Sequence, residues 1–308
     1  MTSAPKPRIS IIGAGLMGHG IAYLFAATGH EVRVHDTDTV ALEQLPRRLG
    51  VIRDLLAGPI TAADRVSGHI SLPETVEQAD VVIEAAAEKI EIKRLIFSAF
   101  ERHAPKHAIL ASNTSVIPIS RIAEDVADKS RVIGAHFWNP PHLVRLVEVV
   151  VSAESSRPAA LKMVDLLRAV GHHPVLVNRD IPGFIGNRLQ HALKREAIAL
   201  VAAGVCDAET VDDVVKLGFG ARLAVLGPLE QSDMVGLQLT KNIHDVLISD
   251  LDVTPHTHPY LDALVAKGDI GMKRGRGFRE WTPEQAQAVR DRLSQFLADA
   301  AAREAKKA

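Results

Sequence analysis

The sequence predicts an α/β fold in which a mostly parallel sheet domain is followed by an all-α domain. Two observations carry this prediction. Short buried-type strands alternate with helical segments as far as Val177, and beyond that residue the apolar periodicity is nearly all helical. The turn-forming stretch 178–183 separates the two halves. We therefore expect a first domain over residues 1–180 and a helical second domain over residues 181–308.

The first half opens with one strand–helix–strand unit. A strand is predicted at 8–12, a helix at 16–28 that ends at Gly29, and a second strand at 31–36. Further helices are predicted at 90–102 and 161–170, and further strands at 80–84, 108–112, 131–135, 145–150 and 173–177. Alternation of this kind is typical of a sheet that helices cover on both faces.

The second half is predicted to contain helices only. The first spans 184–203 and ends at Gly204, and Asp207 caps the next. Later helices are expected at 229–247, at 259–266 and from Pro283 onwards, with only residues 301–308 frayed.

Composition bounds the class of protein. The 308 residues are 47% hydrophobic and 24% charged, with a formal net charge of -1, which gives no electrostatic case for a nucleic-acid partner. The single cysteine, Cys206, excludes an internal disulfide and fits a reducing compartment. No apolar run approaches the ~20 residues of a membrane span, and no secretory signal precedes the first strand. We expect a cytoplasmic protein with no membrane partner and no metal site.

A glycine-rich turn predicts a dinucleotide site. Gly13-Ala-Gly15-Leu16-Met17-Gly18 follows a strand and opens a helix. Gly13 permits the tight turn, Gly15 lets backbone amides approach a pyrophosphate, and Gly18 lets helix and sheet pack closely. Asp36, at the end of the second strand, would accept the ribose hydroxyls and repel a 2′-phosphate, so NAD is favoured over NADP. The alternative is a tight turn with a capping aspartate and no ligand.

A second set of polar residues is suited to moving a proton. Oxidation of an alcohol needs a base for the hydroxyl proton, and histidine suits that role. His136 follows a predicted strand, and Glu148 lies in an apolar run where a carboxylate is costly to bury unpaired. If Glu148 accepts a hydrogen bond from His136, it fixes the tautomer; otherwise it faces solvent on an alternating strand. Ser115 and Asn139 are weaker candidates for the site, because the sequence is equally consistent with Ser115 as a helix cap and with Asn139 as part of a turn.

These residues, in this order, resemble the 3-hydroxyacyl-CoA dehydrogenase family, which includes 3-hydroxybutyryl-CoA dehydrogenases, the gulonate dehydrogenase related to lambda-crystallin, and carnitine dehydrogenases. The segments that carry the resemblance are Ser112-Asn-Thr-Ser115, His136-Phe-Trp-Asn-Pro-Pro141 and Leu146-Val-Glu-Val149. The resemblance implies a Rossmann-type NAD-binding domain and a helical domain that binds substrate and dimerises.

The resemblance also implies roles for individual residues. His136 would be the catalytic base and Glu148 would orient it, while Ser115 and Asn187 would hydrogen-bond the substrate oxygen. Positions that line the cofactor in the family match Glu88, Lys93 and Asn139, and Lys273 matches a lysine on the nicotinamide side.

The departures from the family pattern lie where an acyl-CoA would bind. The stretch 40–73 is shorter than in members that use CoA and contains no lysine. The turn Trp138-Asn-Pro-Pro-His142 is more like that of members acting on free hydroxy acids or aromatic carboxylates, and His142 and Arg145 are candidate ligands of a substrate carboxylate. The sequence does not decide whether Trp138 and Trp281 shape a pocket or pack in the core.

The first choice of function is an NAD-dependent dehydrogenase that interconverts a short 3-hydroxyacyl compound, most simply a CoA thioester of fatty-acid metabolism, and its 3-oxo form. The second is the same chemistry on a free hydroxy acid or on a carboxylated aromatic alcohol or aldehyde. A rival of another class is a non-catalytic NAD(H)-binding or crystallin-like structural protein.

Overall fold

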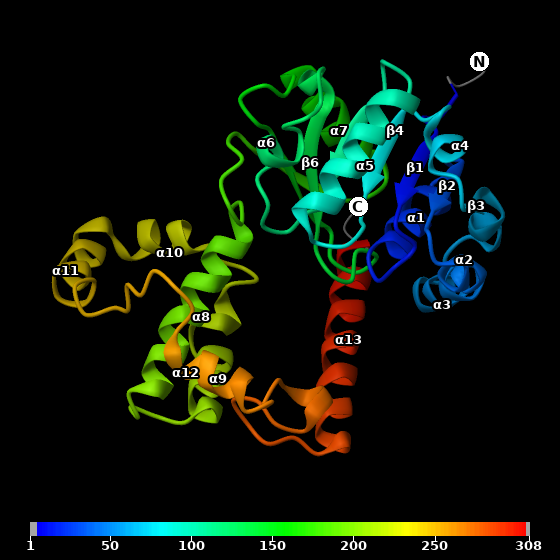
Figure 1. Cartoon of the computed structure of the whole chain (residues 1–308). Coiled ribbons are helices and arrows are strands. Elements are labelled where there is room, and N and C mark those ends of the chain that lie inside the picture. The colour runs from blue at the N-terminus through cyan, green and yellow to red at the C-terminus, as the bar shows by residue number, and fades with distance from the viewer. Residues whose placement is uncertain (1–4, 306–308) are drawn as a thin grey trace. The chain divides into compact units, whose positions relative to one another are not determined.

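The computed structural model describes residues 5–305, which form two compact units. One consists of the described parts of Met1–Arg188 and Ser294–Ala308, and the other of Leu189–Leu293. The first unit holds a sheet covered by helices, and the second is helical (Figure 1). The predicted fold, a Rossmann-type mostly parallel sheet followed by a helical region, is confirmed.

The sheet has eight strands in the spatial order β3-β2-β1-β4-β5-β6-β7-β8. Neighbouring strands are parallel except β6 and β7, which are antiparallel. Strands β1 to β6 therefore end at the same edge of the sheet, and β7 and β8 begin there. The strands are β1 (Ile9–Ile12), β2 (Val32–His35), β3 (Val66–His69), β4 (Val81–Glu84), β5 (Ile109–Ser112), β6 (Val132–Phe137), β7 (Leu146–Val150) and β8 (His173–Val177).

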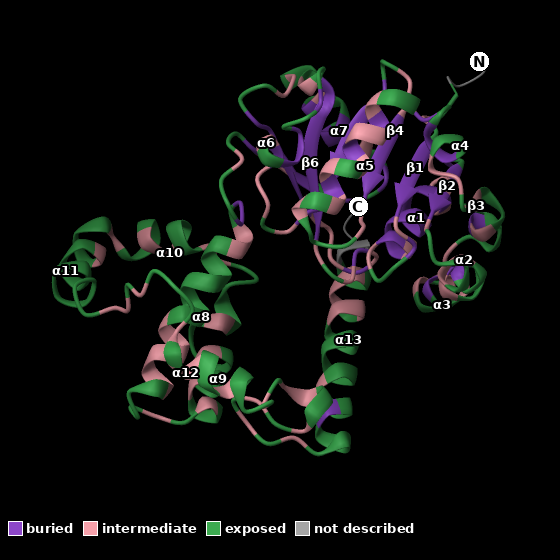
Figure 2. Ribbon diagram, in the orientation of Figure 1, coloured by how far each residue is buried: buried purple, intermediate pink, exposed green. Residues whose placement is uncertain are grey.

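Helices cover both faces of the sheet, and the inner strands between them are buried (Figure 2). Helices α1 (Gly18–Ala27), α3 (Leu45–Leu56) and α7 (Arg157–Ala169) contribute to the core on one face. The other face packs against α4 (Leu72–Val76), α5 (Ile90–His103) and α6 (Ile119–Ile122). The first unit also contains α2 (Thr39–Glu43) and the 3-10 turns η1 (Ile60–Arg65) and η2 (Lys129–Arg131).

Two strands differ from the prediction. Strand β3 was not predicted, because its sequence Val-Ser-Gly-His has no apolar run and its residues are half-buried or exposed at the sheet edge. Strand β6 continues to Phe137, because the ladder with β7 extends to the pair Phe137–Val147. His136 therefore lies inside a strand, whereas the sequence placed it after one.

Two helix starts in the first unit also differ. Residues before Gly18 form the glycine turn, so the predicted apolar position Leu16 lies outside the helix and is 67% exposed. Helix α7 begins at Arg157, earlier than predicted, because Pro158 is compatible with a first helical turn. The expected ending of α1 is confirmed, since Thr28 caps the helix and the next residue, Gly29, has a φ of +86°.

The helical region follows the prediction with two corrections. The helix expected at 229–247 is interrupted by Gly236, whose φ of +96° no helix accommodates. The terminal helix continues through residues 301–305, which were expected to be frayed, while 306–308 lie outside the described residues. Asp207 caps the following helix as predicted, accepting a hydrogen bond from Thr210 N at 2.8 Å. The elements are α8 (Gly186–Ala202), α9 (Ala208–Leu217), η3 (Phe219–Arg222), α10 (Pro228–Val235), α11 (Leu237–Leu247), α12 (Pro259–Ala266), η4 (Met272–Arg274) and α13 (Pro283–Ala305).

Within residues 5–305, no helix has both the length and the apolar character required to cross a membrane.

Candidate active site

The predicted site residues of the first unit gather at the edge where β1 to β6 end. The glycine turn follows β1, Ser115 follows β5, and His136 lies near the end of β6. Glu148 comes to the same edge from near the start of the antiparallel strand β7. Ligands of open α/β sheets bind at this edge, outside the carboxyl ends of the strands.

The glycine turn has the geometry that a pyrophosphate needs. Gly13 has a φ of +106°, and a Cβ there would lie 2.6 Å from the Ala85 carbonyl oxygen. A Cβ at Gly18 would collide with the Gly13 carbonyl, so helix and turn pack too closely for any side chain. At Gly15 no atom lies within 4 Å of the Cβ position, which leaves open space above the backbone. The chain therefore fits an NAD pyrophosphate at the start of α1.

Asp36 is joined to the glycine turn. One carboxylate oxygen accepts a hydrogen bond from Ala14 N at 2.7 Å, and the other accepts from Asp38 N at 2.9 Å. A carboxylate has about four lone-pair sites, so acceptor capacity remains for ribose hydroxyls. Two neighbouring basic side chains point to other partners: Arg33 donates to the Glu74 carbonyl at 2.7 Å, and His35 contacts the His69 carbonyl at 3.2 Å. Arg48 stays at the turn, where it donates to the Ala14 carbonyl at 3.0 Å.

His136 and Glu148 form a buried pair. They lie opposite each other in the β6–β7 ladder, and His136 Nδ1 is 2.8 Å from Glu148 Oε2. The exposed fractions of the two residues are 4% and 1%, so the alternative of a solvent-facing Glu148 is excluded. The imidazole also packs on Trp138 and Phe184, with ring centroids 5.4 and 5.9 Å away.

Glu148 is held in its ionised form. Its other oxygen accepts hydrogen bonds from Ile185 N at 3.0 Å and Gly186 N at 3.1 Å, at the start of α8. Burial alone would raise the pKa of Glu148, but the hydrogen bonds from His136, Gly186 and Ile185 outweigh burial and lower it. An ionised carboxylate only accepts, so Nδ1 of His136 carries a hydrogen. In the neutral ring, Nε2 is then the basic nitrogen, and it makes no hydrogen bond among the described residues.

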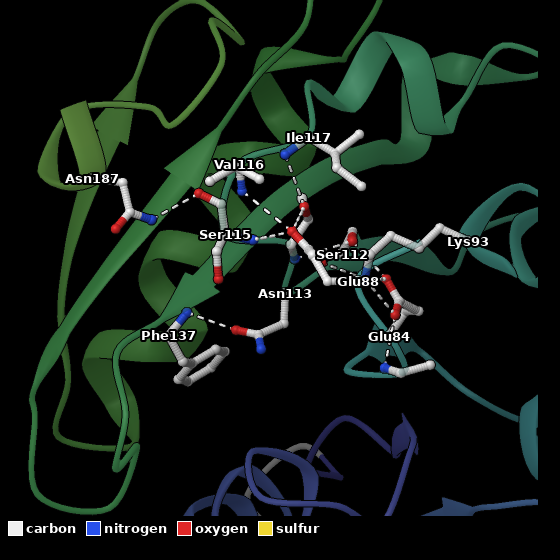
Figure 3. Close-up of polar contacts among 12 residues, drawn as sticks. Glu84, Glu88, Lys93, Ser112, Asn113, Ser115, Val116, Ile117, Phe137 and Asn187 are labelled. Atoms are coloured by element: carbon white, nitrogen blue, oxygen red, sulfur yellow. Dashed lines mark hydrogen bonds and ion pairs between the residues drawn. The ribbon is translucent and has the colours of Figure 1, made fainter. Parts of the chain in front are cut away.

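Ser115 and Asn187 are brought together across the sheet edge. The Asn187 side-chain amide donates to the Ser115 carbonyl at 2.8 Å, which leaves its second amide hydrogen available (Figure 3). The Ser115 hydroxyl makes no hydrogen bond within the described part of the chain. Asn113, in the same loop, accepts a hydrogen bond from Phe137 N at 2.8 Å and so joins this loop to the strand that carries His136.

The four residues that the resemblance assigned to the cofactor differ in their surroundings. Glu88 is partly exposed after β4, and its carboxylate binds the loop that carries Ser115. Lys93 is enclosed, with only 1% of it exposed, and contacts Glu84 and Glu88. Asn139 is exposed in the turn after β6, and Lys273 is exposed in η4 of the other unit.

The structure constrains the candidates for a substrate carboxylate. Burial and the nearby His19 lower the pKa of His142 to about 4, so this imidazole is uncharged at neutral pH. Arg145 Nε donates to the Gly171 carbonyl at 2.9 Å. Trp138 packs on His136, and a Cβ at Gly186 would collide with its ring. Trp281 lines a cavity of about 550 Å³ in the helical unit, with the Arg279 guanidinium 4.9 Å from its ring centre.

Sequence reasoning missed two residues of this edge, Glu84 and Asn113. Glu84 ends the apolar run Val81-Val-Ile-Glu84 and is 0% exposed. Like Glu148, it is an acid inside a buried strand and needs a partner, and this signal is present in the sequence. Asn113 gave no such signal, since its partner is a backbone amide from a distant strand. Within residues 5–305, no group of three or more histidine, cysteine, aspartate or glutamate side chains has a metal-binding arrangement.

Comparison with known proteins identifies the family. The model of the 3-hydroxyacyl-CoA dehydrogenase NAD-binding domain matches residues 8–181, and the model of the C-terminal domain of the same family matches residues 183–281. This chain belongs to the 3-hydroxyacyl-CoA dehydrogenase family. The predicted NAD cofactor and oxidoreductase class are thereby confirmed.

Relatives of different substrate class are similarly close. A 5-formyl-3-hydroxy-2-methylpyridine 4-carboxylate 5-dehydrogenase of Mesorhizobium japonicum is 34% identical over 91% of this chain and 93% of its own length. A probable 3-hydroxybutyryl-CoA dehydrogenase of Bacillus subtilis is 39% identical over 89% of this chain and 97% of its own. A crystal structure of a 5-formyl-3-hydroxy-2-methylpyridine 4-carboxylic acid 5-dehydrogenase, an NAD+-dependent dismutase, superposes with a TM-score of 0.89 at 33% identity, covering 96% of this chain and 97% of the other.

Replacing Asp36 tests the cofactor site. In Asp36→Ala, we expect NADH to bind about tenfold more weakly, a loss of about 1.4 kcal/mol, because two ribose hydroxyls lose an acceptor. Affinity for NADPH should not fall, because the charge that repels its 2′-phosphate is gone. Fluorescence titration with both cofactors measures this. Equal weakening of both would indicate only a disturbed glycine turn, since Asp36 also binds Ala14.

Proposed function

We propose that this NAD-dependent oxidoreductase interconverts a short 3-hydroxyacyl compound and its 3-oxo form, with His136 as the base and Glu148 as the residue that positions it. The observation that carries the proposal is the buried His136–Glu148 pair, 2.8 Å apart, at the same sheet edge as the glycine turn. An ionised Glu148 stabilises the imidazolium that forms when His136 takes a proton.

Each residue of the site has a separate role in the reaction. Bound NAD supplies the hydride acceptor for oxidation. Nε2 of His136 takes the hydroxyl proton as the carbonyl forms, and returns it in the reverse direction. The Ser115 hydroxyl and the second amide hydrogen of Asn187 are donors for the substrate oxygen. The aromatic rings around His136 exclude water from the imidazole and strengthen its interaction with Glu148.

A free acid, in particular a carboxylated ring alcohol or aldehyde, is the second candidate substrate. Its support is the similarity to the pyridine carboxylate dehydrogenase together with the state of the arginines in 40–73. Arg48 donates to the Ala14 carbonyl at 3.0 Å, Arg53 pairs with Asp54, and Arg65 pairs with Glu31. These partners compete with the phosphates of a CoA molecule for the three arginine side chains. The free-acid class would take the protein out of fatty-acid metabolism.

A non-catalytic NAD(H)-binding or crystallin-like role is the rival of another class. A structural protein has no need of a buried, ionised Glu148, because burying a carboxylate costs stability that an apolar residue would not. The retention of this pair therefore favours an enzyme. We also propose that residues 1–180 bind NAD and that residues 181–308 bind substrate and dimerise. The proposed location is the cytoplasm.

Removal of the imidazole tests the mechanism. In His136→Ala, kcat should fall by a factor of about 10²–10⁴, the usual contribution of a general base, while NADH affinity stays unchanged. The variant should unfold at a lower temperature than wild type, because Glu148 loses its buried partner, so turnover is measured at a temperature where the variant is folded. The matched control is His173→Ala, since His173 is an exposed histidine on β8. Turnover by His136→Ala at a rate close to that of the control would rule out the assigned role.

The substrate class is tested by NADH consumption with acetoacetyl-CoA, free acetoacetate and aromatic aldehydes bearing a ring carboxylate, each at equal concentration. Preference for the thioester by kcat/KM would support the 3-hydroxyacyl-CoA class. Preference for a carboxylated aldehyde would support the free-acid class. If a free acid is the substrate, Arg145→Ala should raise its KM about tenfold, because an arginine–carboxylate contact is lost. An unchanged KM would exclude Arg145 as a ligand of the substrate.

We also propose that a second copy of the chain covers the helical unit. Figure 2 shows the helices of this unit exposed or half-buried over most of their length. Within Leu189–Leu293, Ala286 alone is buried, although a unit of this size normally needs a core of its own. Large apolar side chains stay exposed on its helices, and an extended exposed apolar patch commonly marks an interaction site. They include Leu217 (81% exposed), Leu229 (80%), Met234 (66%) and Val246 (79%), and Val225 (86%) is exposed in the turn before α10.

A charged substitution tests the dimer. Val246→Glu on α11 should shift sedimentation from dimer to monomer, because an unpaired carboxylate is costly inside an interface. Ile60→Glu is the control, since Ile60 is as exposed (81%) but belongs to the sheet-bearing unit. A wild-type protein that sediments as a monomer at micromolar concentration would contradict the proposal.

A further inference from the structure

Two carboxylates and one ammonium group meet where β4 ends and α5 begins (Figure 3). Lys93 Nζ lies 2.8 and 2.9 Å from the two oxygens of Glu84 and 3.2 Å from Glu88 Oε2. Lys93 is 1% exposed and Glu84 is 0% exposed. Charged groups are buried this deeply only when they are paired and hydrogen-bonded, so the three side chains constrain one another.

Glu84 is saturated by its neighbours. Besides Lys93, it accepts hydrogen bonds from Ser112 Oγ at 2.6 Å and from Ala86 N at 2.7 Å. Ser112 is the last residue of β5, and Ala86 follows β4. Glu84 therefore joins the ends of two neighbouring strands, and it fixes the position of the Lys93 ammonium.

Glu88 links Lys93 to the loop after β5. Its Oε1 accepts from Thr114 Oγ1 at 2.6 Å, Ser115 N at 2.9 Å and Val116 N at 3.3 Å. Burial alone would raise the pKa of Glu88, but the Thr114 hydrogen bond and the Lys93 charge outweigh burial and lower it. The carboxylate thus stays ionised and binds three donors of one loop.

The same loop contacts both other parts of the site. The Ser115 carbonyl accepts from Asn187, and Asn113 accepts from Phe137 N, next to His136. A change in the position of Glu88 would consequently move the Ser115 hydroxyl relative to Asn187 and His136.

We propose that Glu84 and Lys93 are positioning residues, which act through Glu88 to fix the loop 113–116 and the Ser115 hydroxyl. This inference rests on the proposed function for its effect on turnover. The enclosed Lys93 ammonium lies on two carboxylates, so its contacts within the chain serve to hold Glu88.

The test compares Glu84→Gln/Lys93→Met with wild type. The double variant removes both buried charges together, so it avoids the unpaired Glu84 that would threaten folding in Lys93→Met alone. Lys89→Met is the matched control, since Lys89 is exposed beside the same helix start. Hydrogen–deuterium exchange of the 113–117 amides, NADH affinity, kcat and the pH profile of kcat are measured for each protein.

In the double variant we expect the amides of Ser115 and Val116 to exchange at least tenfold faster, and kcat to fall about tenfold or more, the usual effect of losing a charge-assisted hydrogen bond. NADH affinity should stay within about threefold of wild type, since Glu84 and Glu88 already engage the Lys93 ammonium. The acidic limb of the kcat profile should move to higher pH. Without the Lys93 charge the pKa of Glu88 rises, and its protonated form is an inferior acceptor. Lys89→Met should resemble wild type in all four measurements.

Two results would overturn the inference. Unchanged loop exchange with NADH affinity reduced tenfold or more would make Lys93 a cofactor ligand. Wild-type exchange, kcat and pH profile in the double variant would mean that the two charges only neutralise each other. A wild-type enzyme inactive on every substrate tried would refute the proposed function, but the exchange rates would still decide whether Glu84 and Lys93 hold the loop.

Discussion

The burial of carboxylates at one edge of the sheet is the constraint on which the rest of the site depends. Glu84 and Glu148 are each 1% exposed or less, and an isolated carboxylate there would cost several kcal/mol. Each is therefore surrounded by donors that come from other segments: Lys93 and Ser112 for Glu84, and His136 with the start of α8 for Glu148. Satisfying these two charges brings the strand ends, the Ser115 loop and Asn187 to fixed positions.

The two carboxylates have different consequences for chemistry. Glu148 contacts a group that can change its protonation state, so its charge acts on a proton. Glu84 contacts the enclosed Lys93 and Ser112, so it acts on the position of these side chains. The glycine turn contributes through three positions that lack a side chain: Gly15 leaves room for a pyrophosphate, while Gly13 and Gly18 allow turn and helix to pack closely. At one sheet edge, the glycine turn thus leaves room for the cofactor, Glu148 acts on the proton through His136, and Glu84 helps to position the loop that faces the substrate oxygen.

The sequence predicted most of the first unit, because strands buried on both faces are apolar runs that stand out between helices. It failed where that signal is absent. Strand β3 is polar and lies at the sheet edge, and the break at Gly236 depends on a backbone angle that an apolar pattern does not reveal. The His136–Glu148 contact was foreseen as one of two alternatives, and the ladder between β6 and β7 decided it. Lys93 was foreseen as a cofactor-lining residue, but nothing in its helical spacing indicated an enclosed ion pair.

The sequence by itself determined the order of elements, the glycine turn and the residue types available for chemistry, since these depend on local spacing and polarity. Only the tertiary structure decided which of these residues meet. Glu84 and Ser112 are 28 positions apart, and Ser115 and Asn187 are 72 apart. Such contacts arise because parallel strands end side by side whatever the length of chain between them, and because a buried charge is stable only where distant segments supply its partners.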